Sequence, residues 1–131
     1  MACRIRYHKI VLEPFQAILY LSTYKDIADN LSMDKLGHDT PSPECMTAWI
    51  ARDDDRPFCI VMYLSQECLE EGDEALWHEA LHVATWLWHH AGAGLHVMYN
   101  DEVLTYYQGY VVREVQKALD YQYMLENSHD D

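Results

Sequence analysis

The stretch that decides the expected fold runs from residue 73 to residue 90 and reads DEALWHEALHVATWLWHH. Its composition is strongly helical, so we expect one helix over this range. Residues 78–82 within it read HEALH, an H-E-x-x-H sequence. Residues four apart lie one above the other on a helix, so His78 and His82 can bind a single ion from the same face.

Two histidines in this arrangement favour zinc. Zinc accepts imidazole nitrogen at about 2.0–2.1 Å, and a catalytic site usually keeps three protein ligands and one open position. Glu79 lies beside a ligand and faces slightly away from it, so it can serve as general base for a zinc-bound water. The simpler alternative is a surface-facing pair of histidines on an amphipathic helix. We expect the metal site.

A third ligand has two main candidates, His89 and Glu102. His89 lies seven residues beyond His82, so a continuous helix would place it roughly 10 Å further along the axis. Two ligands of one zinc ion lie only about 4 Å apart, which excludes His89. Glu102 can return to the level of His82 if the chain turns at residues 92–94, which read GAG, and a second helix begins near Asn100. We therefore expect His78, His82 and Glu102 to be the ligands.

These residues resemble the gluzincin clan of zinc peptidases, in which H-E-x-x-H is followed at similar spacing by a glutamate. The sequence from Asn100 to Glu102, followed by Tyr106, Gly109 and Tyr110, is also similar to small single-domain metallopeptidase-like proteins of tailed bacteriophages. The motif-bearing resemblance covers about residues 72–124.

The resemblance implies a zinc-dependent metallopeptidase that hydrolyses peptide bonds with zinc-activated water. His78, His82 and Glu102 would be the zinc ligands, and Glu79 the general base. The implied substrate is an extended peptide or protein that adds to an exposed edge strand by main-chain hydrogen bonds. Tyr106, one helical turn after Glu102, is one candidate for a hydrogen-bond donor to the developing oxyanion.

Charge and composition narrow the partners and the location. The formal net charge is −13, and such a surface repels phosphate backbones, so direct binding of nucleic acid is disfavoured and basic partners are favoured. No apolar run reaches the roughly 18 residues of a membrane span, and the first residues do not resemble a signal peptide. We expect a cytoplasmic protein, in the host cytosol if the chain is phage-encoded. The four cysteines lack paired spacing, so free thiols are expected.

Hydrophobic periodicity predicts an α+β fold in one domain spanning residues 1–131. The regions 46–51 and 58–64 flank an acidic turn and predict a β-hairpin. Residues 16–21 fit either a strand or a helix, and residues 4–12 are only weakly strand-like. Helices are expected at 23–31, 73–90 and 100–124. Together they predict a sheet of about three strands, with the H-E-x-x-H helix and a long C-terminal helix packed on one side. The resemblance to gluzincins implies the same arrangement, a minimal zincin-like domain.

Three classes of function remain compatible with the sequence. The first is the zinc metallopeptidase. The second is a zinc-stabilised, catalytically weak or inactive phage protein that binds a host protein through its acidic surface. The third is an acidic mimic of DNA, in which the H-E-x-x-H sequence would be incidental. Bound zinc would exclude the third class as the sole explanation, and Glu79→Gln separates the first from the second. The oligomeric state is not indicated by the sequence.

Overall fold

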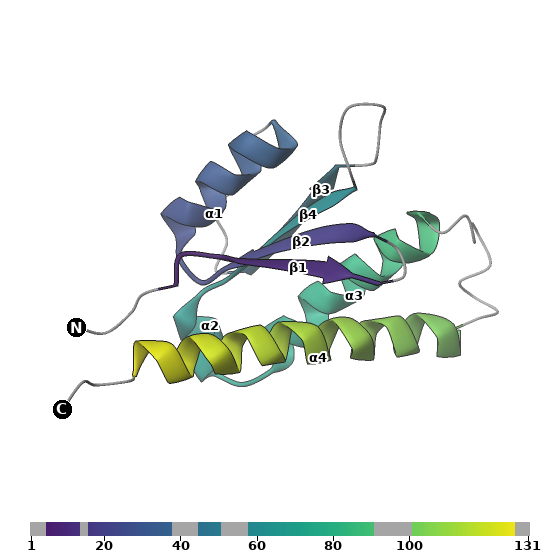
Figure 1. Ribbon diagram of the computed structural model, residues 1–131. Helices are drawn as coiled ribbons and strands as arrows, with labels where there is room; N and C mark the ends of the chain where they lie inside the picture. The colour runs from purple at the N-terminus through teal and green to yellow at the C-terminus, as the bar shows by residue number, and fades with distance from the viewer. Residues whose placement is uncertain (1–4, 14–15, 38–44, 51–57, 91–100, 128–131) are drawn as a thin grey trace.

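The computed structural model describes residues 5–13, 16–37, 45–50, 58–90 and 101–127, without the side chains of residues 49, 50, 89, 90 and 101–103. Four strands form one mixed sheet in the order β1-β2-β4-β3 (Figure 1). The elements follow the chain as β1 (His8–Leu12), β2 (Ala17–Ser22), α1 (Lys25–Leu31), a π-helical turn (Ser32–Leu36), β3 (Cys45–Ile50), β4 (Cys59–Leu64), α2 (Gln66–Glu70), α3 (Glu74–His90) and α4 (Asp101–Glu126).

The sheet combines two antiparallel pairs through one parallel pair. β1 pairs antiparallel with β2, and β3 pairs antiparallel with β4, as expected for the predicted hairpin. β2 and β4 run parallel at the centre, with Leu19 opposite Ile60 and Leu21 opposite Met62. β3 therefore forms one edge of the sheet and β1 the other.

Helices cover both faces of the sheet. Leu19 and Ile60 point into a core shared with α3 and α4, whereas their neighbours Tyr20 and Val61 pack against α1 and the π-helical turn on the other face. This follows from the strand geometry, in which successive side chains point to opposite faces. Figure 1 shows α1 on one side of the sheet and α3 and α4 on the other.

Two expectations about the architecture were wrong. The sheet has four strands rather than about three, because the ambiguous segment at residues 16–21 and the weak segment at 4–12 both form strands. The helices also do not all pack on one side. β2 is buried on both faces, so its sequence is a nearly continuous run of apolar residues. Such a run is typical of a buried strand and of a buried helix alike, so the sequence did not distinguish the two. The mixed α and β class and the long C-terminal helix are confirmed.

The helix α3 lies under the sheet because one stripe of it is apolar. Leu76, Ala80, Val83 and Leu87 recur at intervals of three and four residues and are fully or almost fully buried. α3 contacts β3 and β4, whereas α4 contacts β1. The two helices therefore lie side by side, with α3 beneath the β3 edge and α4 beneath the β1 edge. None of the helices in the described part of the chain combines the length and hydrophobicity that a membrane span requires.

A buried amide ties the end of α4 to the sheet. Gln122 is 4% exposed; its Nε2 donates to Thr23 Oγ1 at 2.9 Å, and its Oε1 lies 2.8 Å from His8 Nε2. The neighbouring Glu126 carboxylate accepts a hydrogen bond from Tyr24 Oη at 2.7 Å. These bonds hold α4 against β1 and the start of α1.

We expect Gln122→Ala to lower the free energy of unfolding by about 1–3 kcal/mol, because it removes the hydrogen-bond partner of the buried Thr23 hydroxyl and of the half-buried His8 imidazole. Urea denaturation measures the change. Gln116→Ala is the matched control, since the Gln116 amide bonds only to the exposed Asp120 carboxylate among the described residues. Equal losses in the two variants would contradict a structural role for the buried network.

Candidate metal centre

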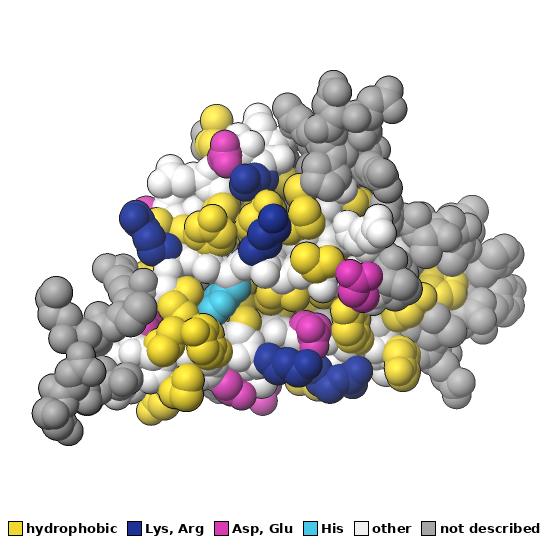
Figure 2. Space-filling view, viewed as in Figure 1, with side chains coloured by type: hydrophobic (Ala, Val, Ile, Leu, Met, Phe, Trp, Pro, Cys, Tyr) yellow, Lys and Arg dark blue, Asp and Glu magenta, His cyan; other side chains and the backbone are white. Residues whose placement is uncertain are grey.

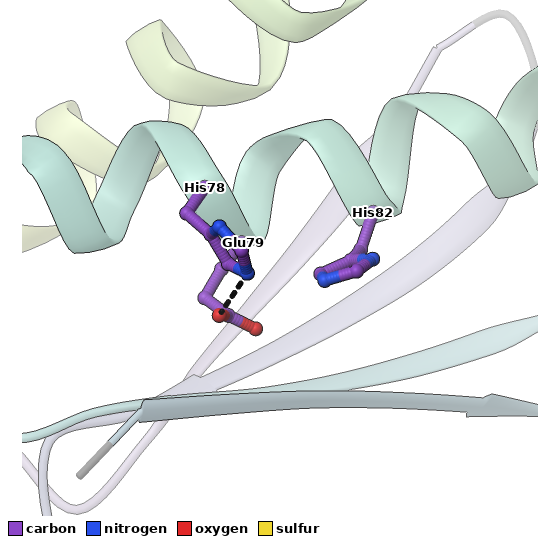
Figure 3. Close-up of side chains that lie close together, drawn as sticks. All are labelled: His78, Glu79 and His82. Atoms are coloured by element: carbon purple, nitrogen blue, oxygen red, sulfur yellow. Dashed lines mark ion pairs between the residues drawn. The ribbon is translucent and has the colours of Figure 1, made fainter.

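The three residues His78, Glu79 and His82 come together on one side of α3. One ligand atom from each can be chosen so that all three lie within 4.8 Å of one another. The two imidazole rings meet edge to face, with centroids 5.0 Å apart and an interplanar angle of 79°. Figure 3 shows the three side chains projecting from α3 toward the strands. The structure thus contains a group of three side chains that could hold a metal ion, in which Glu79 stands beside the two predicted histidine ligands.

The exposure of these side chains separates them into two kinds. The His78 side chain is 66% exposed and His82 is also exposed, whereas Glu79 is 5% exposed. The Trp86 ring stacks on His82 with centroids 5.9 Å apart, which restricts the orientation of that imidazole. Two imidazoles beside an accessible space suit zinc or a similar ion and leave room for solvent or substrate, so these residues fit the metal that the motif predicts.

Glu79 is anchored to the edge strand β3. Thr47 Oγ1 donates a hydrogen bond of 2.5 Å to Glu79 Oε1. The Cys45 thiol lies near enough to this carboxylate for the charge of Glu79 to raise the pKa of the thiol. The other oxygen, Oε2, lies 3.8 Å from His78 Nε2, the pair joined by the dashed line in Figure 3. One carboxylate oxygen is thus held by the sheet while the other faces a candidate ligand.

The Cys45 thiol lies beside this anchor and stays protonated at neutral pH. Burial, and then the negative charge of Glu79, raise the pKa of the Cys45 thiol to about 11. A protonated thiol can donate to Glu79 but is a poor nucleophile and metal ligand. Cys45, Cys59 and Cys68 carry thiols rather than disulfide bonds, as expected from their spacing; Cys3 lies outside the described residues.

The contacts between Glu79 and β3 had no signal in the sequence. Thr47 lies on a strand that was predicted and Cys45 lies one residue before its predicted start, but nothing in their local pattern indicates which helix residue they face. The register of β3 against β4 places Thr47 opposite Met62, and the packing of α3 beneath this edge then brings Glu79 to it. Such pairing arises from tertiary structure alone.

Glu102 lies in the first turn of α4, and its side chain is outside the described residues. Gln108 Nε2 donates to the Trp77 carbonyl at 2.9 Å, and the Trp88 and Tyr107 rings lie 6.1 Å apart, so the first part of α4 runs beside α3. The described part of α4 packs on the β1 side of α3, whereas the histidines lie on the β3 side. The assignment of Glu102 as a zinc ligand stays a prediction. It requires the first turn of α4 to bring Glu102 to the side of α3 on which His78 and His82 lie.

Tyr106 is 70% exposed on α4. Its role as a donor to an oxyanion stays a prediction, and we do not include it in the candidate centre.

Comparison with known proteins adds no assignment. The chain matches no protein-family model, and neither the curated proteins nor the solved structures include a detectable relative. The candidate centre therefore rests on its own geometry and chemistry.

Proposed function

We propose that this protein is a zinc-dependent metallopeptidase in which His78 and His82 bind the metal, Glu102 completes the ligand set and Glu79 is the general base. The observation that carries the proposal is the different exposure of the three side chains on α3. Two accessible imidazoles flank one buried carboxylate, and that carboxylate accepts a hydrogen bond from Thr47 on the neighbouring strand. A pair of histidines that merely solvated the helix would not need an oriented, buried carboxylate between them.

A bound zinc ion would supply Lewis acidity, polarising a peptide carbonyl and lowering the pKa of a water molecule. Glu79 then accepts the proton of the attacking water and delivers it to the leaving amine. Thr47 holds one carboxylate oxygen, so the other is free to exchange the proton. This fixed orientation is what general base catalysis requires, because proton transfer depends on the distance and alignment of the two groups.

The edge strand supplies a place for the substrate backbone. β3 pairs with β4 on one side and is the last strand of the sheet on the other. Among the described residues no strand pairs with this outer edge of β3, so an extended peptide can add to it through main-chain hydrogen bonds. Because Thr47 on this strand contacts Glu79, a peptide bound here would pass close to the base. Substrates are accordingly expected to be unstructured peptides rather than folded domains.

Peptide cleavage by the zinc-loaded protein tests the proposal directly. A mixed library of unstructured peptides is incubated with the wild type and with Glu79→Gln, and the new termini are mapped by mass spectrometry. Cleavage by the wild type alone supports the proposal, whereas equal cleavage by both proteins contradicts it.

Thr47→Val should lower kcat about tenfold or more while leaving KM and the zinc content nearly unchanged. The reason is that a hydrogen bond to a charged group contributes about 1.5–3 kcal/mol, and its loss leaves Glu79 free to turn. Thr47→Ser retains the hydroxyl and is the matched control, so it should recover most of the activity. Steady-state kinetics on one cleaved peptide measures the effect. A rise in KM with unchanged kcat would show that Thr47 contributes only to binding.

A further inference from the structure

A cavity of about 360 Å³ adjoins the candidate metal centre and shares His78 with it. It lies where the first residue of β3, the helix α2, the turn before α3 and the first turns of α3 meet. Its size is at the lower end of the roughly 300–1,000 Å³ found for ligand pockets, which suits a single side chain. The lining residues are Cys45, Cys68, Glu71, Gly72, Glu74, Ala75 and His78.

The lining combines an apolar part with an acidic part. Cys45, Cys68 and Ala75 offer thiol and methyl groups. Cys68 is 6% exposed, and Cys45 and Ala75 are half-buried, so these side chains form the less exposed part of the lining. Glu71 and Glu74 are exposed and lie at the rim. Lys and Arg are missing from the described residues that line the cavity. Its character is therefore that of an apolar slot with negative charge at its mouth.

The turn between α2 and α3 leaves the mouth open. Gly72 has a φ of +130°, a conformation that L residues rarely adopt, and a Cβ at this position would meet no described atom within 4 Å. Gly72 therefore adds backbone but no side chain to the cavity, whereas Glu71 before it and Glu74 after it both line the cavity.

The two carboxylates lack a cationic partner in the part of the chain that the structure describes, because its ion pairs involve other residues. A second metal site is also disfavoured. Among the described residues, the donors that converge closely enough to hold an ion are His78, Glu79 and His82, and the glutamates of the rim are not among them. The cavity is thus suited to an organic cation rather than to an inorganic one.

We propose that this cavity is a specificity pocket that binds the side chain of a lysine or arginine close to the scissile bond of the substrate. Such a side chain has an apolar stem, which matches the wall formed by Cys45, Cys68 and Ala75, and a cationic head, which matches Glu71 and Glu74. The position beside His78 places the bound side chain next to the metal. The inference rests on the proposed peptidase function, since it assigns a substrate class to the same site.

Binding to the zinc-loaded Glu79→Gln protein tests the pocket without requiring cleavage. The probes are fluorescein-labelled unstructured peptides that are identical except for one residue, either lysine or the uncharged norleucine, placed in turn at each position. Fluorescence anisotropy gives Kd. For the best position we expect the lysine peptide to bind roughly three- to tenfold more tightly, the range that two partly exposed charge contacts support. Added salt should reduce the ratio.

The double substitution Glu71→Gln with Glu74→Gln should bring this ratio close to one. Glu67→Gln with Glu70→Gln is the matched control, because it removes the same charge from exposed residues of α2 that do not line the cavity and should leave the ratio unchanged. Melting curves check that each variant folds. The proposal would be overturned if the Glu79→Gln protein bound the lysine and norleucine peptides equally. It would also be overturned if the Glu67/Glu70 control lost the preference for lysine to the same extent as the Glu71/Glu74 variant.

Mapping the cleavage sites of the wild type separates the two proposals. Cleavage next to basic residues supports both. Cleavage without a preference for basic residues supports the peptidase proposal and contradicts the proposed specificity pocket. If no peptide is cleaved, the peptidase proposal fails, while the binding measurement on Glu79→Gln still decides whether the cavity selects a basic side chain.

Discussion

His82→Ala is expected to reduce the zinc in the purified, zinc-loaded protein from about one ion per chain to none after gel filtration, because two ligands cannot retain an ion that needs three. Metal analysis by plasma mass spectrometry measures this. The same variant should lose the rise in melting temperature that zinc gives to the wild type, since binding to the folded state adds to its stability by about 4 kcal/mol when zinc is at 1,000 times Kd.

Two variants sharpen this result. His89→Ala is the matched control, because the rise of the helix places that residue too far from His82 to share its ion, and it should retain zinc. Glu102→Ala tests the third ligand and should lose zinc as His82→Ala does. Full retention of zinc in His82→Ala would contradict the candidate centre. Retention in Glu102→Ala alone would move the third ligand to another residue and leave the two histidines in place.

Glu79→Gln is expected to lower kcat by roughly 10²–10⁴-fold, the range that positioned general bases contribute, with zinc content unchanged. Glutamine has the same shape, and its carbonyl oxygen can still accept the hydrogen bond from Thr47, so the fold around β3 should be preserved. It cannot accept the proton of the attacking water. Kinetics on a peptide identified in the library screen, with metal analysis of the same samples, measures both quantities.

The outcome also decides between the peptidase and the alternative function. Cleavage that persists in Glu79→Gln would contradict the assigned base. If the wild type retains zinc and cleaves no peptide in the library, the zinc-stabilised protein that binds a host partner through its acidic surface becomes the better account.

The sequence was most informative where a pattern is local. The motif helix was expected at residues 73–90 and runs from Glu74 to His90. The two strands of the hairpin were expected at 46–51 and 58–64, and each observed end lies within one residue of the predicted one. The four-residue spacing of His78 and His82 is a property of any helix, so their convergence followed directly. These elements can be predicted from hydrophobic periodicity and turn composition, and both are visible in a single sequence.

The rest depends on contacts between distant segments. β2 is buried against α1 on one face and against α3 and α4 on the other, so its apolar run could not distinguish a strand from a helix. The short helix α2, which was not predicted, begins at a capping residue, Ser65, whose Oγ accepts from Cys68 N at 3.1 Å. The anchoring of Glu79 by Thr47 joins residues 32 positions apart, and no local pattern indicates it.

The coordination of zinc in the loaded protein tests the central claim most directly. X-ray absorption at the zinc edge, measured on the wild type and on His82→Ala, reports the kind of ligand and its distance. We predict two imidazole nitrogens at about 2.0–2.1 Å and one carboxylate oxygen at about 2.0–2.2 Å in the wild type, with the imidazole signal reduced in the variant. A zinc shell dominated by sulfur, or an imidazole signal that His82→Ala leaves unchanged, would contradict a metal centre built on His78 and His82.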